Sequence, residues 1–153
     1  MILLRWYSSN HKSPSATVIY AHGGGMILGS VKAYDKVVAA HVARTGVPFL
    51  AVDYRLAPEH PHPIPVNDVY AALNWLVAHS EEFGVDTSRI VLADKHLTPF
   101  LSWNTTDNET GWQALLGCSR GREMVTETAA PGRMVDATGM PPLYIEVGKL
   151  DLF

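Results

Sequence analysis

The sequence predicts an α/β protein in which a mostly parallel sheet is flanked by helices. Short apolar runs rich in β-branched and aromatic residues are typical of buried strands, and they alternate with segments of helical apolar spacing. Over residues 1–93 of the 153 the alternation is strand, helix, strand, helix, strand. Strands joined through helices run parallel, because the crossover returns the chain to the same end of the sheet.

Composition and charge exclude several classes of protein. A net charge of −3 without a run of Lys or Arg argues against a nucleic-acid partner. The single cysteine, Cys118, excludes an internal disulfide and fits a reducing compartment. The apolar start Met1–Leu4 is too short for a signal peptide, and no stretch is long enough to span a membrane. We therefore expect a cytoplasmic protein with no membrane span.

Each expected element follows from a local pattern. We expect a helix from Ser30, which can cap it, to Thr45, with Gly46 as its C-terminal glycine. A second helix begins at Val66 and ends before Gly84, with the apolar stripe Val66, Val69, Tyr70, Leu73, Leu76 and Val77. Residues 2–7 predict an edge strand. The four strands expected to be parallel in one sheet are Thr17–Ala21, Val47–Tyr54, Arg89–Ala93 and Leu143–Val147.

We expect one domain made of three stretches. Residues 1–93 form the first part of the sheet, residues 94–142 are mostly irregular, and residues 143–153 form a strand and a turn. Within the irregular stretch, Thr110–Leu116 predicts a short helix, and a turn is expected at Asp86–Ser88 before the third strand.

The segment Thr17–Ser30 organises the chain, because a short apolar strand leads directly into His22 and three consecutive glycines. Glycines leave the backbone N–H groups unhindered, and such a preorganised loop can stabilise an oxyanion. The alternative is a flexible turn. The preceding strand and the helical segment that follows favour the binding loop.

Four segments, in order, resemble the hormone-sensitive-lipase-like esterases of the α/β-hydrolase fold. This resemblance implies a serine esterase or lipase-like hydrolase of small-molecule carboxylic esters, with the chain order Ser, Asp, His and no cofactor or metal. The four matching segments are His22–Met26, Tyr54–Pro61, Asp68–Leu76, and Pro142–Gly148 together with Leu150–Asp151.

The resemblance also assigns roles to individual residues. The backbone N–H groups of Gly24 and Gly25 would be the oxyanion-hole donors, with Gly23 shaping the loop. His22 would support the loop structurally and would not transfer protons. Asp151 would be the acid that orients the catalytic histidine.

The sequence departs from the family at the nucleophile. The family places its serine in a Gly-x-Ser-x-Gly turn after the strand that here ends at Ala93, but this chain continues Asp94-Lys95-His96-Leu97. No histidine follows Asp151 in the sequence. We therefore expect a partial α/β-hydrolase fold without the nucleophile-elbow unit and the C-terminal part, and a chain that is inactive as given.

Another string, Gly117–Gly121, has the spelling of the nucleophile turn around Ser119. The motif requires a preceding strand and a following helix, whereas here a helical segment comes first. Asp94 and His96 do not make a metal site, because no third ligand has recognisable spacing.

Three interpretations stay open at this stage. The first is an esterase chain that has lost part of its catalytic domain by deletion, splicing or an incorrect gene model. The second is a non-catalytic remnant that binds a partner or an acyl ligand through the glycine loop. The third is a hydrolase that uses Ser119 with a histidine recruited from elsewhere in the chain.

Overall fold

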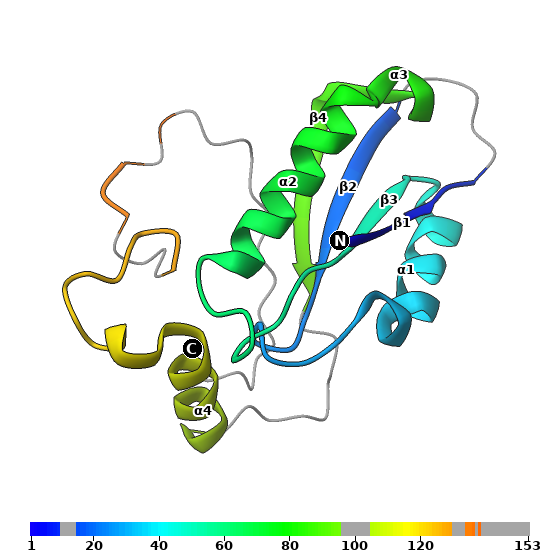
Figure 1. Cartoon of the computed structure of the whole chain (residues 1–153). Helices are drawn as coiled ribbons and strands as arrows, with labels where there is room; N and C mark the ends of the chain where they lie inside the picture. Colours follow the sequence, from blue (N-terminus) through cyan, green and yellow to red (C-terminus); the bar gives the residue numbers. More distant parts are fainter. Residues whose placement is uncertain (10–14, 96–104, 130–133, 137, 139–153) are drawn as a thin grey trace.

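The computed structural model describes residues 1–9, 15–95, 105–129, 134–136 and 138, and its centre is a four-stranded sheet (Figure 1). The sheet order is β1-β3-β2-β4, with β2 parallel to both β3 and β4 and β1 antiparallel at the β3 edge. The strands are β1 (Leu3–Tyr7), β2 (Ser15–His22), β3 (Phe49–Asp53) and β4 (Val85–Lys95).

This sheet confirms the α/β class and the parallel pairing of three expected strands. The edge strand expected near the N-terminus is β1, and it pairs with β3 from Leu3↔Asp53 to Tyr7↔Phe49. The fourth expected strand, Leu143–Val147, lies outside the described residues.

Register assigns the strand side chains to two faces. Ile19 of β2 lies opposite Leu50 of β3 and Leu92 of β4, so these three side chains share one face. The next residue, Tyr20, lies opposite Ala51 and Ala93 on the other face.

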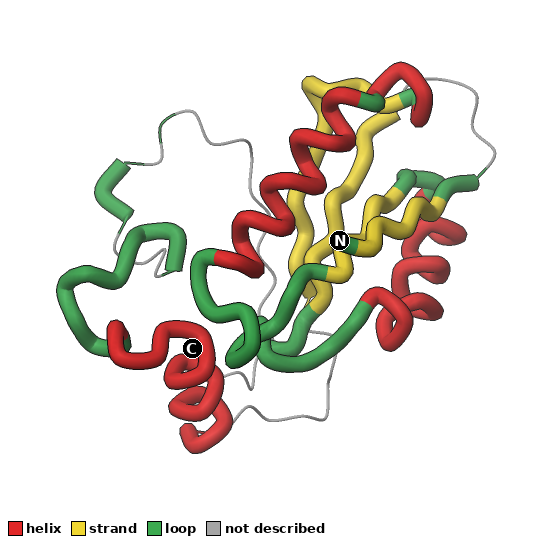
Figure 2. The backbone as a smooth tube through the Cα atoms, in the orientation of Figure 1, coloured by secondary structure: helices red, strands yellow, loops and turns green. Residues whose placement is uncertain are grey.

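Two long helices cover these faces, one on each side (Figure 2). Helix α2 (Ile64–Ala78) packs over Ile19, Leu50 and Val52, and α1 (Val31–Thr45) packs over Tyr20, Phe49 and Ala51. The remaining helices are short α3 (Ser80–Phe83), α4 (Thr105–Leu116) and the 3₁₀ turn η1 (Gly117–Ser119).

Both predicted caps of α1 are confirmed. The Ser30 hydroxyl accepts a hydrogen bond from the Ala33 N–H at 3.2 Å, and Gly46 takes the left-handed conformation at φ 71°. The structure adds a third anchor, because the Asp53 carboxylate at the end of β3 accepts the Val31 N–H at 2.7 Å. A carboxylate at a helix N-terminus also favours the helix dipole. The start of α1 is therefore tied to the sheet.

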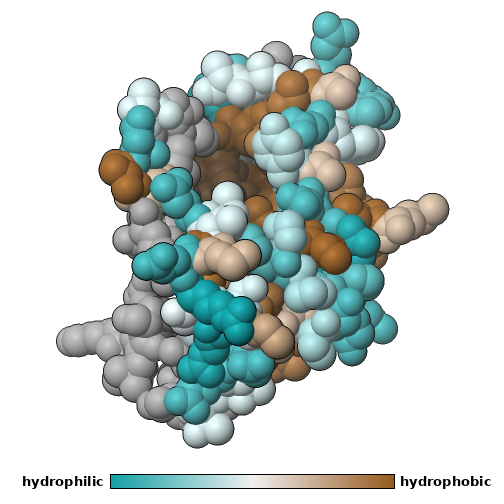
Figure 3. Space-filling model, turned by 60° about the vertical axis from the view of Figure 1, so that its left-hand side comes forward, coloured by the Kyte–Doolittle hydropathy of each residue, from teal (hydrophilic) through white to brown (hydrophobic). Residues whose placement is uncertain are grey.

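The predicted apolar stripe of α2 is only partly correct. The helix begins at Ile64 rather than Val66 and ends at Ala78 rather than just before Gly84, because the separate short helix α3 occupies Ser80–Phe83. It buries Asp68 as well as Leu76. Tyr70 and Val77, which the stripe included, are 63% and 44% exposed. Figure 3 shows a hollow lined by apolar side chains on the face of the molecule that it presents.

Two further boundaries differ from the prediction. Strand β4 begins at Val85, before the expected turn, although the turn contacts persist: the Asp86 carboxylate accepts from the Ser88 N–H at 3.0 Å. Because β4 contains this turn, its pairing with β2 changes register between Ser15 and Thr17. Helix α4 begins at Thr105, five residues earlier than its apolar pattern indicated.

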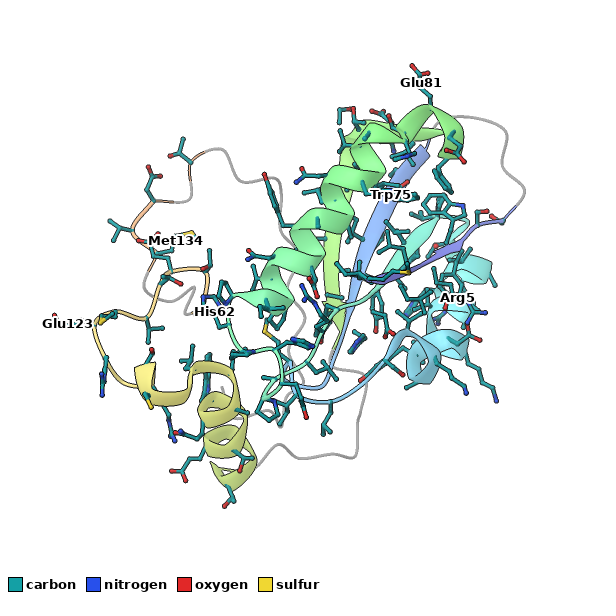
Figure 4. The ribbon with its side chains drawn as sticks, in the orientation of Figure 1. Arg5, His62, Trp75, Glu81, Glu123 and Met134 are labelled. Carbon is teal, nitrogen blue, oxygen red and sulfur yellow. The ribbon has the colours of Figure 1, made fainter. Side chains whose placement is uncertain are left out.

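Helix α4 and the segment after it are both held to the loop that precedes α2. The His62 N–H donates to the Leu115 carbonyl at 2.9 Å, and its ring Nε2 lies 3.1 Å from the Thr126 hydroxyl. Figure 4 shows His62 between the start of α2 and this segment. Burial lowers the pKa of His62, which favours the neutral ring at this contact. No helix among the described residues is long and apolar enough to cross a membrane.

Candidate active-site loop

The glycine loop lies at the carboxyl end of β2, where parallel strands of an α/β sheet commonly present binding groups. Three successive residues have positive φ: Gly24 at 127°, Gly25 at 59° and Met26 at 62°. The Gly24 carbonyl closes the loop by accepting the N–H groups of Ile27 at 3.1 Å and Leu28 at 3.0 Å. Within the described residues, the N–H groups of Gly24 and Gly25 donate none of the loop's backbone hydrogen bonds. Among the described residues, no backbone acceptor engages these two groups, to which the family resemblance assigns the role of oxyanion donors.

Close packing explains why glycine is needed at two positions of this loop. A Cβ on Gly24 would lie 2.2 Å from the Leu28 carbonyl oxygen. A Cβ on Gly29, at φ 101°, would lie 2.5 Å from His22 Nδ1 and 2.6 Å from the Gly23 carbonyl oxygen. Any side chain at either position would collide with the loop itself.

His22 is buried under this loop, with 2% of its surface exposed. Its ring stacks on Tyr54 at a centroid distance of 4.3 Å and on Tyr34 at 5.7 Å. Its Nδ1 lies 3.0 Å from the Gly23 carbonyl oxygen, and the Tyr54 hydroxyl donates to the His22 carbonyl at 2.5 Å. The two tyrosines therefore hold both the ring and the backbone of the residue that precedes the glycines.

The loop after β3 is joined to the glycine loop, because the Ala57 N–H donates to the Met26 carbonyl at 2.9 Å. This second loop is fixed in turn by an ion pair between Arg55 and the buried Asp68 of α2. The Arg55 side chain donates to both Asp68 oxygens, at 2.9 and 2.7 Å, and its backbone N–H donates at 3.0 Å. Burial acts to raise the pKa of Asp68, but the hydrogen bonds from Arg55 outweigh it and leave the pKa below its usual value.

An open hollow of about 540 Å³ adjoins this second loop, between Pro58 and α4. Its other lining residues are mostly polar: Glu109, Thr110, Gln113, Ala114 and Arg120. Pro58, which lines this hollow, directly follows Ala57, whose N–H donates to the Met26 carbonyl of the glycine loop.

The remaining candidate residues do not join the glycine loop in the described structure. Ser119 is exposed in η1, directly after a helix, so it does not have the strand-to-helix setting that the nucleophile motif requires. Cys118 beside it is an exposed free thiol. Asp151 lies outside the described residues. In the described ranges no three potential ligands gather to hold a metal ion.

Sequence reasoning missed the residues that support the loop. Tyr54 stands in a matching segment, but nothing in its neighbours indicates that its hydroxyl reaches His22, 32 positions away. The stacking of Tyr34 on His22 has no sequence signal. Gly29 could have been singled out, because a glycine immediately before a helix cap often marks a special backbone conformation.

A mostly parallel sheet, with helices on both faces and a glycine loop at the carboxyl end of β2, has the architecture of an α/β hydrolase. Residues 18–95 match the family described as alpha/beta hydrolase fold, which covers more than half of the chain. The chain belongs to this family.

Similar proteins are esterases and lipases. Carboxylesterase NlhH of Mycobacterium tuberculosis is 46% identical over 76 residues, which are 50% of this chain and 24% of that protein. Lipase 2 of a Moraxella species is 37% identical over 86 residues, 56% of this chain and 20% of that protein. The matches therefore span about a quarter of the length of these curated relatives.

Solved esterase structures also superpose on this chain, which again covers only part of them. A bacterial heroin esterase superposes with a TM-score of 0.83 at 28% identity, over 94% of this chain and 60% of that one. A hyperthermophilic esterase from Pyrobaculum calidifontis superposes with a TM-score of 0.59 at 38% identity, over 61% of this chain and 30% of that one.

Proposed function

We propose that this chain carries the oxyanion-stabilising part of a carboxylic-ester hydrolase. The observation that carries the proposal is the pair of N–H groups on Gly24 and Gly25 at the carboxyl end of β2, which no backbone acceptor engages among the described residues. Gly23 shapes the loop, and His22 supports it from below.

The chemistry of ester hydrolysis explains the value of such a loop. When a nucleophile attacks an ester carbonyl, negative charge develops on the carbonyl oxygen, and two N–H donors held in place stabilise it. Removing one such donor in a serine hydrolase costs about 10²–10³ in kcat. Here the donors are held by the Gly24 turn and by His22, which lies between two tyrosine rings. This support keeps them in place before charge develops.

Asp151 is proposed as the acid of a Ser, Asp, His triad, and a small carboxylic ester is the proposed substrate. The support is the resemblance of Leu150–Asp151 to the family's acid turn and the names of the similar proteins, a carboxylesterase and a heroin esterase. A cytoplasmic location and the absence of a nucleic-acid partner stay predictions from the sequence.

The printed sequence places no nucleophile at the end of β4. Strand β4 ends at Lys95 and the sequence continues His96-Leu97-Thr98, whereas a hydrolase of this family presents its serine there on a sharp turn. Without an activated nucleophile beside a base, the loop alone provides little acceleration. We therefore propose that this chain does not turn over esters by itself.

An assay with a p-nitrophenyl short-chain ester tests this directly. We expect the purified chain and its Ser119→Ala variant to release p-nitrophenol at the same rate, equal to buffer with an inert protein. The Ser119→Ala variant is a clean control, because this side chain is exposed and lies outside the core. Turnover that Ser119→Ala abolishes would contradict the proposal and identify Ser119 as the nucleophile.

The N–H groups of Gly24 and Gly25 also favour a second candidate, in which the loop binds an acyl carboxylate without catalysis. Titrating the chain with butyrate should then shift the backbone amide resonances of Gly24 and Gly25. The amides of Gly84 and Gly121, which lie outside the loop, should not move. Equal shifts at all four glycines would rule out specific binding at the loop.

A further inference from the structure

His62 joins the loop before α2 to two segments that come much later in the chain (Figure 4). Its backbone N–H donates at 2.9 Å to the carbonyl of Leu115, in the last turn of α4, where helix carbonyls have no partner within the helix. Its ring Nε2 lies 3.1 Å from the Thr126 hydroxyl, which lies 2.9 Å from the Thr128 hydroxyl. We call these contacts the His62 junction.

The second ring nitrogen of His62, Nδ1, is buried and has no hydrogen-bond partner among the described residues. The neutral ring can place its single proton on Nε2 and donate to Thr126, which leaves no N–H without an acceptor. The protonated ring carries an N–H at both nitrogens, and the described residues offer no acceptor to the one at Nδ1. Because a buried donor without an acceptor is costly, and a charged one more so, the junction favours the neutral ring.

No carboxylate of the described residues forms an ion pair with His62 that would compensate a charge on the ring. The charged or titratable side chains described on the surrounding loop, on α2, on α4 and on the segment after it are Arg55, Glu59, His60, Asp68, Glu109, Arg120, Arg122, Glu123 and Glu127. Arg55 and Asp68 bind each other, and the glutamates are exposed. Burial lowers the pKa of His62 below its usual value of 6.5, in agreement with this geometry.

We propose that protonation of His62 releases α4 and the segment after it from the loop before α2. Docking is at full strength above pH 6.5, where the ring is neutral in both states, and it weakens as the pH falls from that value through the lowered pKa of the docked state. Release opens the hollow beside Pro58, because Gln113 of α4 and Arg120 form its other side. This response does not require that the chain hydrolyse an ester.

Hydrogen exchange of the His62 backbone N–H, followed by NMR, measures docking directly, because this group donates to α4. The exchange is compared at about pH 7.5 and about pH 5.5, on either side of the ordinary histidine pKa, after correction for the pH dependence of the chemical exchange rate. We expect the protection of this N–H to fall several-fold at the lower pH. The N–H groups of Ile19 and Leu50, which are buried in the sheet, should keep their protection.

Two variants assign the response to a single histidine. His62→Gln removes the titrating ring but keeps the backbone N–H and a side-chain amide that can hydrogen-bond Thr126, so its protection should be the same at both pH values. His60→Gln is the matched control, because His60 lies two residues away and also titrates near neutral pH, and this variant should keep the full response.

An NMR titration of the His62 ring in the unmodified protein keeps the test valid if His62→Gln fails to fold. The loss of protection should follow the protonation of this ring as the pH is lowered. The proposal is wrong if the His62 N–H is unprotected at the higher pH, if its protection is equal at both pH values, if His62→Gln loses protection as the unmodified protein does, or if His60→Gln abolishes the response.

Discussion

Replacing Gly29 with alanine should lower the free energy of unfolding by about 3 kcal/mol or more. The added Cβ would lie 2.5 Å from His22 Nδ1, and the backbone at φ 101° is one that side chains rarely adopt. The His22 ring cannot move aside easily, because it is buried between Tyr34 and Tyr54. Denaturant unfolding followed by circular dichroism measures the loss.

Gly84→Ala is the matched control for this substitution. Gly84 also has a positive φ, 63°, but a Cβ there would meet nothing within 4 Å. Gly84→Ala should therefore lower the free energy of unfolding by only about 1 kcal/mol, the cost of placing a side chain on a left-handed backbone. The difference between the two variants therefore reports the packing of the loop against His22. Equal losses would show that the loop yields without strain and that His22 does not restrain it.

Local patterns predicted the elements whose causes are local. Ser30 and Gly46 mark the ends of α1 because capping depends on neighbouring residues, and the strand pattern of Thr17–Ala21 depends on its own apolar run. The His22-Gly23-Gly24-Gly25 loop was found in the same way. Its conformation is set largely by the glycines themselves.

The remaining features depend on partners distant in the chain. Asp68 does not belong to the predicted apolar stripe, yet it is buried, with its charge satisfied by Arg55. Tyr70 matches an apolar helical stripe, but periodicity cannot say whether another element covers it, and in the described residues it is exposed. The support of His22 by Tyr54 likewise arises only when β2 and β3 pair.

The Arg55–Asp68 pair should be the most sensitive charge interaction of the described structure. Removing Arg55 leaves a buried carboxylate without its hydrogen-bonding partner, which is costly, whereas exposed ion pairs contribute little. Arg55→Leu should therefore lower the free energy of unfolding several-fold more than Arg5→Leu does. The Arg5→Leu variant breaks only the exposed Arg5–Asp35 contact of 3.0 Å. Urea unfolding of the two variants at neutral pH makes the comparison.

The pH dependence of the Arg55→Leu effect distinguishes a buried charge from a simple loss of packing. In the unmodified protein the pKa of Asp68 in the folded state lies below its usual value of 3.8, so its stabilising contribution is present above that value and is lost as the pH falls through the folded pKa. Without Arg55, the burial of Asp68 remains and is opposed by the weaker attraction of His60. We therefore expect burial to raise the pKa of Asp68 above its value in the unfolded chain.

The sign of the contribution then reverses. In the variant, Asp68 favours folding when it is protonated, so its contribution is fully present below the unfolded pKa and is lost as the pH rises through the raised folded pKa. The difference in stability between the unmodified protein and Arg55→Leu should therefore be largest near neutral pH and should shrink toward about pH 4. A difference that stays constant with pH would mean that Arg55 acts through packing alone. The Arg5→Leu variant should show no such narrowing, because Asp35 remains partly exposed without its partner.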